Sequence, residues 1–142
     1  MNSIIEIDNL KKIYSNGKHA LNGINVNIEK GKFFGLLGPN GAGKTTTIGI
    51  LTGLVNLTSG KIKVNGLDII KDYKKTRKMI GLSPQEINLD VFFTIRELLI
   101  FQGGYYGLSI SESKKRVDKI LFDLGLEEKA YSKARELSGG MK

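Results

Sequence analysis

Cysteine is absent from this chain of 142 residues, and histidine occurs once, at His19. Without a thiol the protein has no disulfide, no thiolate zinc site and no cysteine nucleophile. The sequence also lacks a long uncharged run, since Glu6 and Asp8 interrupt the apolar N-terminus and no stretch reaches the ~18 residues of a membrane-spanning helix. We therefore expect a cytoplasmic chain that reaches a membrane only through another protein.

Clustered positive charge is missing as well, although 22 Lys and Arg against 14 Asp and Glu give a net charge of +8. The excess is shared between the two halves of the sequence, and the densest runs, 71–78 and 114–119, contain Asp72 and Asp118. Such runs are typical of solvated helix faces, and no basic stripe alternates with aromatic residues. We predict a folded globular domain with no nucleic-acid partner.

Apolar patterning predicts a β-rich first half. We expect strands at 3–8, 13–14 and 24–28, with an Asn-Gly turn that favours a hairpin before the third. The unbroken apolar run at 33–37 predicts a strand buried on both faces inside a parallel sheet. After a glycine-rich loop, residues 44–54 predict a helix. The order is strand, glycine loop, helix.

The middle of the chain predicts a strand at 61–66, a helix at 72–78 and a short apolar strand at 79–82. Beyond residue 90 the pattern becomes helical.

Two capping boxes mark these later helices. Thr94 with Glu97 opens the first, and Ser109 with Glu112 opens a second that Gly125 closes. The sequence therefore predicts an α/β chain with a β-rich half followed by a helical half.

Residues 38–45 read Gly-Pro-Asn-Gly-Ala-Gly-Lys-Thr and match the phosphate-binding pattern G-x-x-x-x-G-K-[ST]. Glycines let successive backbone N–H groups turn inward around an anion. Lys44 can reach the outer phosphates, Thr45 offers a hydroxyl to Mg²⁺, and the helix that begins here aims its positive dipole end at the anion. The pattern favours a nucleoside triphosphate site over a plain glycine turn. Its candidate residues are Gly38, Pro39, Asn40, Gly41, Ala42, Gly43, Lys44, Thr45 and Thr46.

A second glycine-rich segment, Leu-Ser-Gly-Gly-Met-Lys, occupies residues 137–142. Ser138 can cap a helix, and the two glycines expose backbone N–H groups, so the segment is a second small anion site. By itself, Ser-Gly-Gly is more often a plain loop.

The phosphate loop, Gln85 after a predicted strand, and the Leu-Ser-Gly-Gly segment occur in an order that resembles the nucleotide-binding domain of ABC transporters, and the likeness covers the whole chain. The resemblance implies an ABC-type P-loop NTPase fold, with an antiparallel β-subdomain, a partial parallel core sheet and a helical subdomain, incomplete at its C-terminus. We expect residues 1–142 to form a partial domain, with 1–85 as the β-subdomain and core and 86–142 as the helical subdomain.

The resemblance also implies roles for single residues. Tyr14 resembles the aromatic residue on which the family stacks adenine, although a tyrosine packed at a hairpin edge is the alternative. Gln85 resembles the glutamine that contacts Mg²⁺ and the attacking water, so it and Lys44 are the candidate catalytic residues, and Thr45 and Gln85 the candidate metal ligands. Ser138, Gly139 and Gly140 are implied to contact the γ-phosphate of ATP bound by a second subunit. We therefore expect ATP and Mg²⁺ as ligands and a homodimer.

Several phrases, among them LGPNGAGKTTTIGIL and YYGLS, resemble export-type ATPases that serve a separate integral membrane permease. The implied function is to couple ATP binding and hydrolysis to export of a substrate, at the inner face of the cell membrane. Five aromatic residues in the helical half are candidate permease contacts, but we expect them in the core instead: Phe92, Phe93, Phe101, Tyr105 and Tyr106.

The family's Walker B aspartate, catalytic glutamate and switch histidine have no counterpart in these residues, and we read His19 as an exposed bystander. We expect an N-terminal fragment of a larger domain that is poorly stable and hydrolyses no ATP alone. A non-transport soluble ABC module is the alternative, although the spacing from Lys44 to Ser138 is transporter-like. A P-loop kinase or GTPase would need a lid arginine cluster or an Asn-Lys-x-Asp motif, and neither is present.

Overall fold

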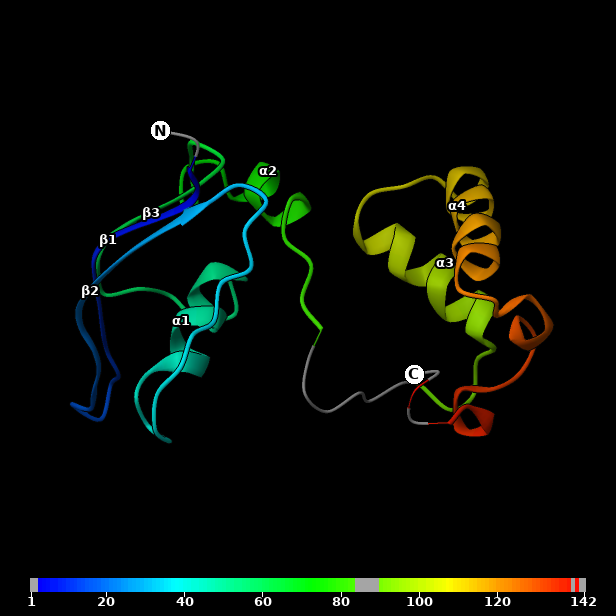
Figure 1. Cartoon of the computed structure of the whole chain (residues 1–142), viewed down its shortest axis with the longest axis horizontal. Coiled ribbons are helices and arrows are strands. Elements are labelled where there is room, and N and C mark those ends of the chain that lie inside the picture. Colours follow the sequence, from blue (N-terminus) through cyan, green and yellow to red (C-terminus); the bar gives the residue numbers. More distant parts are fainter. Residues whose placement is uncertain (1–2, 84–89, 139, 141–142) are drawn as a thin grey trace. The chain divides into compact units, whose positions relative to one another are not determined.

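A computed structural model describes residues 3–83, 90–138 and 140. The chain divides into two compact units, Met1–Leu82 and Ser83–Lys142, and each is described by itself (Figure 1). Residue 85, where we placed the boundary between subdomains, lies outside the described residues.

The first unit is built on a four-stranded sheet with the order β2-β1-β3-β4, in which each pair of neighbours is antiparallel. The strands are β1 (Ser3–Ile13), β2 (His19–Glu29), β3 (Ser59–Val64) and β4 (Leu67–Asp68). A tight turn joins β1 to β2, with the Tyr14 N–H donating to the carbonyl of Lys18 at 2.9 Å. The predicted hairpin is confirmed.

The β1 strand runs through the interval that we expected to separate two strands at 3–8 and 13–14. The interval is an irregularity within one strand: the register with β2 shifts between Ile7 and Leu10, and Asn9 has φ 45°. The N–H of Asn9 donates to Oδ1 of Asn25 at 2.8 Å. A side-chain acceptor thus replaces one ladder partner and allows the strand to continue.

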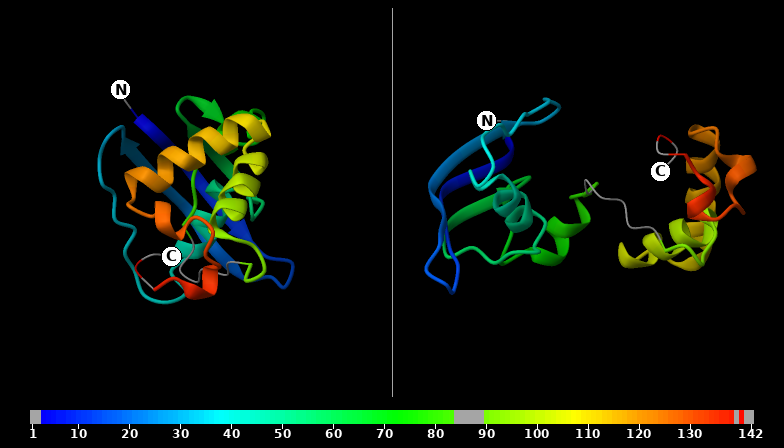
Figure 2. Two further views of the ribbon diagram at one scale, coloured as in Figure 1. Left: turned by 90° about the vertical axis from the view of Figure 1, so that its right-hand side faces the viewer. Right: turned by 90° about the horizontal axis from the view of Figure 1, so that it is seen from below.

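One face of the sheet is buried against helix α1 (Lys44–Leu51), which lies along it in Figure 2. Apolar residues alternate toward this face, as the period of a strand requires. The other face carries charged residues, and in the strand register Glu6 lies opposite Lys63 and Asp8 opposite Lys61. The core of this unit consists of Ile7, Leu10, Leu21, Ile50 and Ile62.

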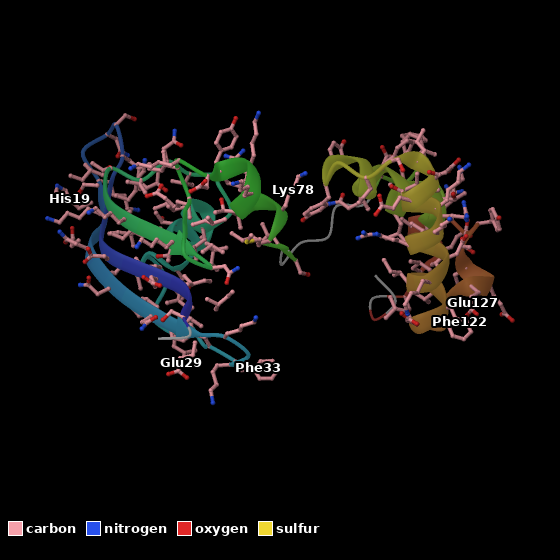
Figure 3. The ribbon with its side chains drawn as sticks, turned by 90° about the horizontal axis from the view of Figure 1, so that it is seen from above. His19, Glu29, Phe33, Lys78, Phe122 and Glu127 are labelled. Carbon is pink, nitrogen blue, oxygen red and sulfur yellow. The ribbon has the colours of Figure 1, made fainter. Side chains whose placement is uncertain are left out.

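The prediction of a buried strand at 33–37 is wrong. These residues form no helix or strand and are all exposed, with Leu37 91% exposed and Phe33 pointing away from the sheet in Figure 3. A strand buried on both faces needs a hydrogen-bonded neighbour on each side. None of the described strands pairs with this segment, so no parallel pair forms among the described residues.

The predicted strand at 79–82 is also absent, because these residues carry no ladder hydrogen bonds in the described structure. They follow the short helix α2 (Tyr73–Lys78), which a hydrogen bond joins to the turn after α1. Arg77 donates from Nη2 to the carbonyl of Gly53 at 3.3 Å. Gly53 has φ 76°, and its missing Cβ leaves room for this guanidinium.

The second unit contains helices α3 (Ile95–Tyr105) and α4 (Ile110–Asp123), followed by two 3-10 turns at Glu127–Lys129 and Ala134–Glu136. Within the parts of the chain that the structure describes, no helix is both long enough and apolar enough to span a bilayer.

The helix ends of this unit follow the sequence prediction. At α3 the capping box is complete: the Glu97 N–H donates to Thr94 Oγ1 at 3.3 Å, and the Glu97 carboxylate accepts from the Thr94 N–H at 2.8 Å. At α4 only half of the box forms, with the Glu112 N–H donating to Ser109 Oγ at 3.2 Å. Gly125, at φ 64°, follows α4 in the conformation expected of a closing glycine.

Aliphatic residues alone form the core of the second unit: Ile95, Val117, Leu121, Ala130, Ala134 and Leu137. Our expectation that the aromatic residues pack in the core is wrong. Phe92 is 79% exposed and Tyr105 85% exposed, and Phe93, Phe101 and Tyr106 are also exposed. The α3–α4 interface is filled by smaller side chains. Phe93 packs edge-on against Phe101 outside this core, at 5.0 Å between ring centroids.

Candidate nucleotide-binding site

The phosphate loop lies between the exposed segment 33–37 and the start of α1. Gly41 has φ 84° and Gly43 has φ 90°, both in the left-handed region that favours glycine. At Gly43 a Cβ would also lie 2.7 Å from the carbonyl oxygen of Ala20 on β2. The glycines of the motif are therefore required by the backbone geometry and by its close approach to the sheet.

The N-terminus of α1 is uncapped by any side chain. Gly43 is its N-cap, no side chain accepts a capping hydrogen bond from the first N–H groups, and no acidic residue lies in the first turn. The first N–H groups of a helix have no partner within the helix, and they carry the positive end of its dipole. The loop therefore presents donors and positive potential to an anion, as a phosphate site requires.

The Lys44 side chain folds back from the start of α1 onto the first residues of the loop. Its Nζ donates to the carbonyl of Gly38 at 2.5 Å and to that of Pro39 at 2.8 Å. An ammonium has three donors, so these bonds leave one for a ligand. The arrangement holds the positive charge at the mouth of the loop, where a phosphate can share it.

Tyr14 lies beside the loop, although 32 positions separate it in sequence from Thr46, the residue that it contacts there. Its hydroxyl and Thr46 Oγ1 are 3.3 Å apart, which joins the β1–β2 turn to the first turn of α1. The Lys12 ammonium lies 4.9 Å from the centroid of the Tyr14 ring, and the side chain remains 37% exposed. A nucleobase can stack on an aromatic ring at this position while the phosphates of the same nucleotide lie in the loop.

Lys12 is a neighbour of this site that the sequence reading missed. Lys12 lies in β1 and Tyr14 follows its last residue. Side chains two positions apart in an extended backbone point to the same side, and this signal would have placed Lys12 with Tyr14.

One candidate metal ligand, Thr45, lies within the described residues. Thr45 is exposed at the start of α1, where its hydroxyl can meet a cation held by bound phosphates. No group of three His, Asp or Glu side chains able to hold a metal occurs within residues 3–83, 90–138 and 140. Mg²⁺ commonly takes one or two protein ligands and completes its shell with phosphate oxygens and water. This donor set fits a nucleotide-bound Mg²⁺.

The remaining candidate residues belong to the second unit or lie outside the described residues. Gln85 and Gly139 lie outside the described residues. Ser138 and Gly140 are exposed and belong to the second unit, next to the buried Leu137. Their contact with a nucleotide stays a prediction.

The uncapped glycine loop, with its lysine and the neighbouring tyrosine, has the form expected of a P-loop. The sequence pattern of the ABC transporter family matches residues 21–142, so this chain belongs to that family.

Its relatives include the linearmycin resistance ATP-binding protein of Bacillus subtilis, 46% identical over 98% of this chain and 44% of that protein. The Nod factor export ATP-binding protein of Paraburkholderia xenovorans is 42% identical over 97% of this chain and 45% of that protein. The chain thus spans less than half the length of these two curated relatives.

Solved structures share the fold. The subunit cbiO1 of Clostridium perfringens, part of the ABC transporter complex cbiONQ, aligns with a TM-score of 0.82 at 32% identity, over 99% of this chain and 57% of that one. A dimer of the ATP-binding cassette MJ0796 bound to ADP and Pi aligns with a TM-score of 0.75 at 29% identity, over 96% of this chain and 64% of that one. The predicted ABC-type P-loop NTPase fold is confirmed.

Proposed function

We propose that this chain is the ATP-binding part of a subunit that drives export through a separate membrane permease. The observation that carries the proposal is the uncapped glycine loop with Lys44 across its mouth and Tyr14 at its side. The export assignment is supported by relatives that are named for export and for resistance to an antibiotic.

The nucleotide is held by three groups in this proposal. Backbone N–H groups of the loop and of the first turn of α1 receive the phosphates, and Lys44 neutralises the outer ones while it stays bonded to the loop carbonyls. Tyr14 stacks on the base, and its hydroxyl bond to Thr46 fixes the distance from base to phosphates. Mg²⁺, when bound, neutralises phosphate charge, and Thr45 is its protein ligand.

The second half of the site comes from a second copy of the chain. Ser138, Gly139 and Gly140 of one subunit close over the ATP of the other, and Gln85 positions the attacking water. The solved dimer of a related cassette supports a paired arrangement.

These 142 residues alone bind ATP without hydrolysing it. The family polarises its attacking water with a glutamate for which these residues offer no counterpart, so Lys44 and Gln85 have no general base to act with.

The permease contact lies on the helical unit. Phe92, Phe101 and Tyr105 are more than half exposed there, and clustered exposed aromatic side chains are typical of protein interfaces. This exposure favours the interface over the core role that we expected for them. The subunit would then sit at the inner face of the membrane through its permease.

Equilibrium dialysis with Mg·ATP tests the nucleotide site. We expect Lys44→Ala to weaken binding by about ten- to a hundredfold, because charge-assisted bonds to phosphate are lost. Tyr14→Ala should weaken it by about fivefold or more through loss of stacking. Lys32→Ala, at an exposed position outside the loop, is the matched control and should leave binding unchanged. Phosphate release should stay at the level of a blank.

Failure of the parent chain to bind ATP, or equal binding by the parent and Lys44→Ala, would overturn the proposed nucleotide site. Phosphate release that Lys44→Ala abolishes would overturn the claim that this chain cannot hydrolyse ATP.

A further inference from the structure

Four lysines form a single stripe along α2 and the turn before it. Lys71, Lys74, Lys75 and Lys78 have the spacing i, i+3, i+4, i+7, which places side chains on one side of a helix. All four are exposed, whereas Thr76, on the opposite side, is 2% exposed. Figure 3 shows Lys78 extending away from the helix. We call these four residues the lysine stripe.

The lysine stripe lies apart from the ion pairs that the described residues form. The ion pairs among the described residues all lie in the second unit, joining Arg96 to Asp118, Arg116 to Glu112 and Lys119 to Asp123. No lysine of the stripe forms an ion pair with a described residue.

Two carboxylates lie close to the stripe in sequence, and one of them, Asp68, offsets part of the charge of Lys71. Asp68 accepts the backbone N–H groups of Ile70 and Lys71 at 2.8 and 3.0 Å, which lowers its pKa below the ordinary value. Asp72 precedes α2 and makes no side-chain capping bond. Since residues 71–78 hold five cations and this one carboxylate, a strong positive field remains.

Arg77, the fifth cation of residues 71–78, is not part of the stripe and makes contacts within the first unit. Its guanidinium donates to Gly53 and lies 5.3 Å from the centroid of the Tyr73 ring. The Lys74 ammonium lies 6.0 Å from the same ring. Two cations therefore already lie against the one aromatic ring of α2, which disfavours stacking of a nucleobase there.

We propose that the lysine stripe binds the headgroups of anionic phospholipids. Lysine is a flexible point charge, suited to a fluid array of phosphates, whereas recognition of a fixed phosphate usually employs the planar fork of arginine. Met79 is 50% exposed and follows Lys75 by four positions, so an apolar side chain flanks the stripe and can enter the headgroup boundary. Clusters of about four to eight basic residues on a helix are typical of surfaces that bind anionic lipid.

This contact goes beyond the proposed function because it gives the first unit its own hold on the bilayer, in addition to any permease. It requires neither ATP nor a second subunit. Its test is therefore independent of the nucleotide site, and either result leaves the ATP-binding experiment to be judged separately.

Co-sedimentation with lipid vesicles tests the proposal on the whole 142-residue chain. The probes are vesicles of phosphatidylcholine alone and of phosphatidylcholine with phosphatidylglycerol. We expect binding only to the second kind at about 0.1 M salt, and its loss at about 1 M, where the Debye length falls from about 10 Å to about 3 Å. The triple variant Lys71→Gln, Lys75→Gln, Lys78→Gln should weaken binding by roughly tenfold or more.

A second triple variant, Lys114→Gln, Lys115→Gln, Lys129→Gln, removes the same charge from exposed positions in the second unit. It should stay within about twofold of the parent. Circular dichroism checks that both variants keep the parent fold.

Three results would overturn the proposal. Equal losses in the two triple variants would assign binding to net charge, and binding that survives high salt would assign it to apolar residues such as Phe33 and Leu37. Loss of binding to a single-stranded RNA in the stripe variant, with vesicle binding unchanged, would make the stripe a nucleic-acid surface.

Discussion

The two units of this chain differ in how they bury their apolar residues. In the second unit Leu121 is 3% exposed and belongs to a closed aliphatic core. In the first, Leu37 is 91% exposed within a five-residue apolar run that has no strand partner among the described residues. Both leucines belong to segments with a clear apolar pattern. The difference in their burial therefore depends on which elements of the chain can pack against each segment.

A helix satisfies its backbone hydrogen bonds within itself and needs one packed face. The helix α4 finds that face in α3 and in the turns that follow it. A strand buried on both faces needs neighbours on two sides and layers above and below it. The second unit therefore closes with short-range partners, while the run at 33–37 finds no such neighbour among the described strands.

Truncation of one leucine in each unit gives the largest expected difference. Leu121→Ala should destabilise the second unit by about 2–5 kcal/mol, because it leaves a cavity in a closed core. Leu37→Ala should change stability by less than about 0.5 kcal/mol, because the side chain is already in water. Urea unfolding followed by helical circular dichroism measures both, and similar losses would show that Leu37 is buried after all.

Two glycines of the phosphate loop provide the next comparison, within the first unit. Gly41→Ala should cost about 1 kcal/mol, since its φ is positive but its surroundings are open. Gly43→Ala carries the same backbone penalty. Its new Cβ would also clash with the carbonyl oxygen of Ala20, which should lower the free energy of unfolding by about a further 1–3 kcal/mol. Thermal melting compares them, and equal costs would contradict the close approach of the loop to β2.

The capping residues of the second unit come third. Thr94→Ala should destabilise α3 by about 1 kcal/mol, because Thr94 belongs to a complete capping box. Ser109→Ala should cost less, since only half of its box forms. Urea unfolding of the two variants side by side tests the order, and a larger cost at Ser109 would reverse the account of these caps.

The smallest effect is a pH dependence in each unit. Hydrogen bonds from the Thr94 N–H and hydroxyl lower the pKa of Glu97 below its ordinary 4.5, and backbone N–H groups lower that of Asp68 below 3.8. Below those ordinary values the unfolded chain binds more protons than the folded one, so stability is present above them and is lost as the pH falls through the folded pKa. Glu97→Gln should flatten this acid loss for the second unit and Asp68→Asn for the first, in melts from about pH 6 to about pH 3. An unchanged slope in either variant would contradict the corresponding shift.

Local patterns were sufficient to predict the helix ends of the second unit, the β1–β2 hairpin and the glycines of the phosphate loop. Each depends on residues within about four positions of one another, as in the bond between Thr94 and Glu97. The bond between Tyr14 and Thr46 crosses 32 positions, and only the resemblance to a family suggested that these residues meet. The exposure of Phe92 and Tyr105 could not be predicted, because apolar patterning does not distinguish a core from an interface.

The central claim is that the loop at 38–45, with Tyr14 beside it, is a working nucleotide site in this chain. Hydrogen–deuterium exchange with and without Mg·ATP tests it most directly. ATP should slow exchange in the loop, in the first turn of α1 and in the turn after Tyr14, and Lys44→Ala should abolish the effect. Exchange that ATP leaves unchanged in the loop, or slows equally in Lys44→Ala, would contradict the account.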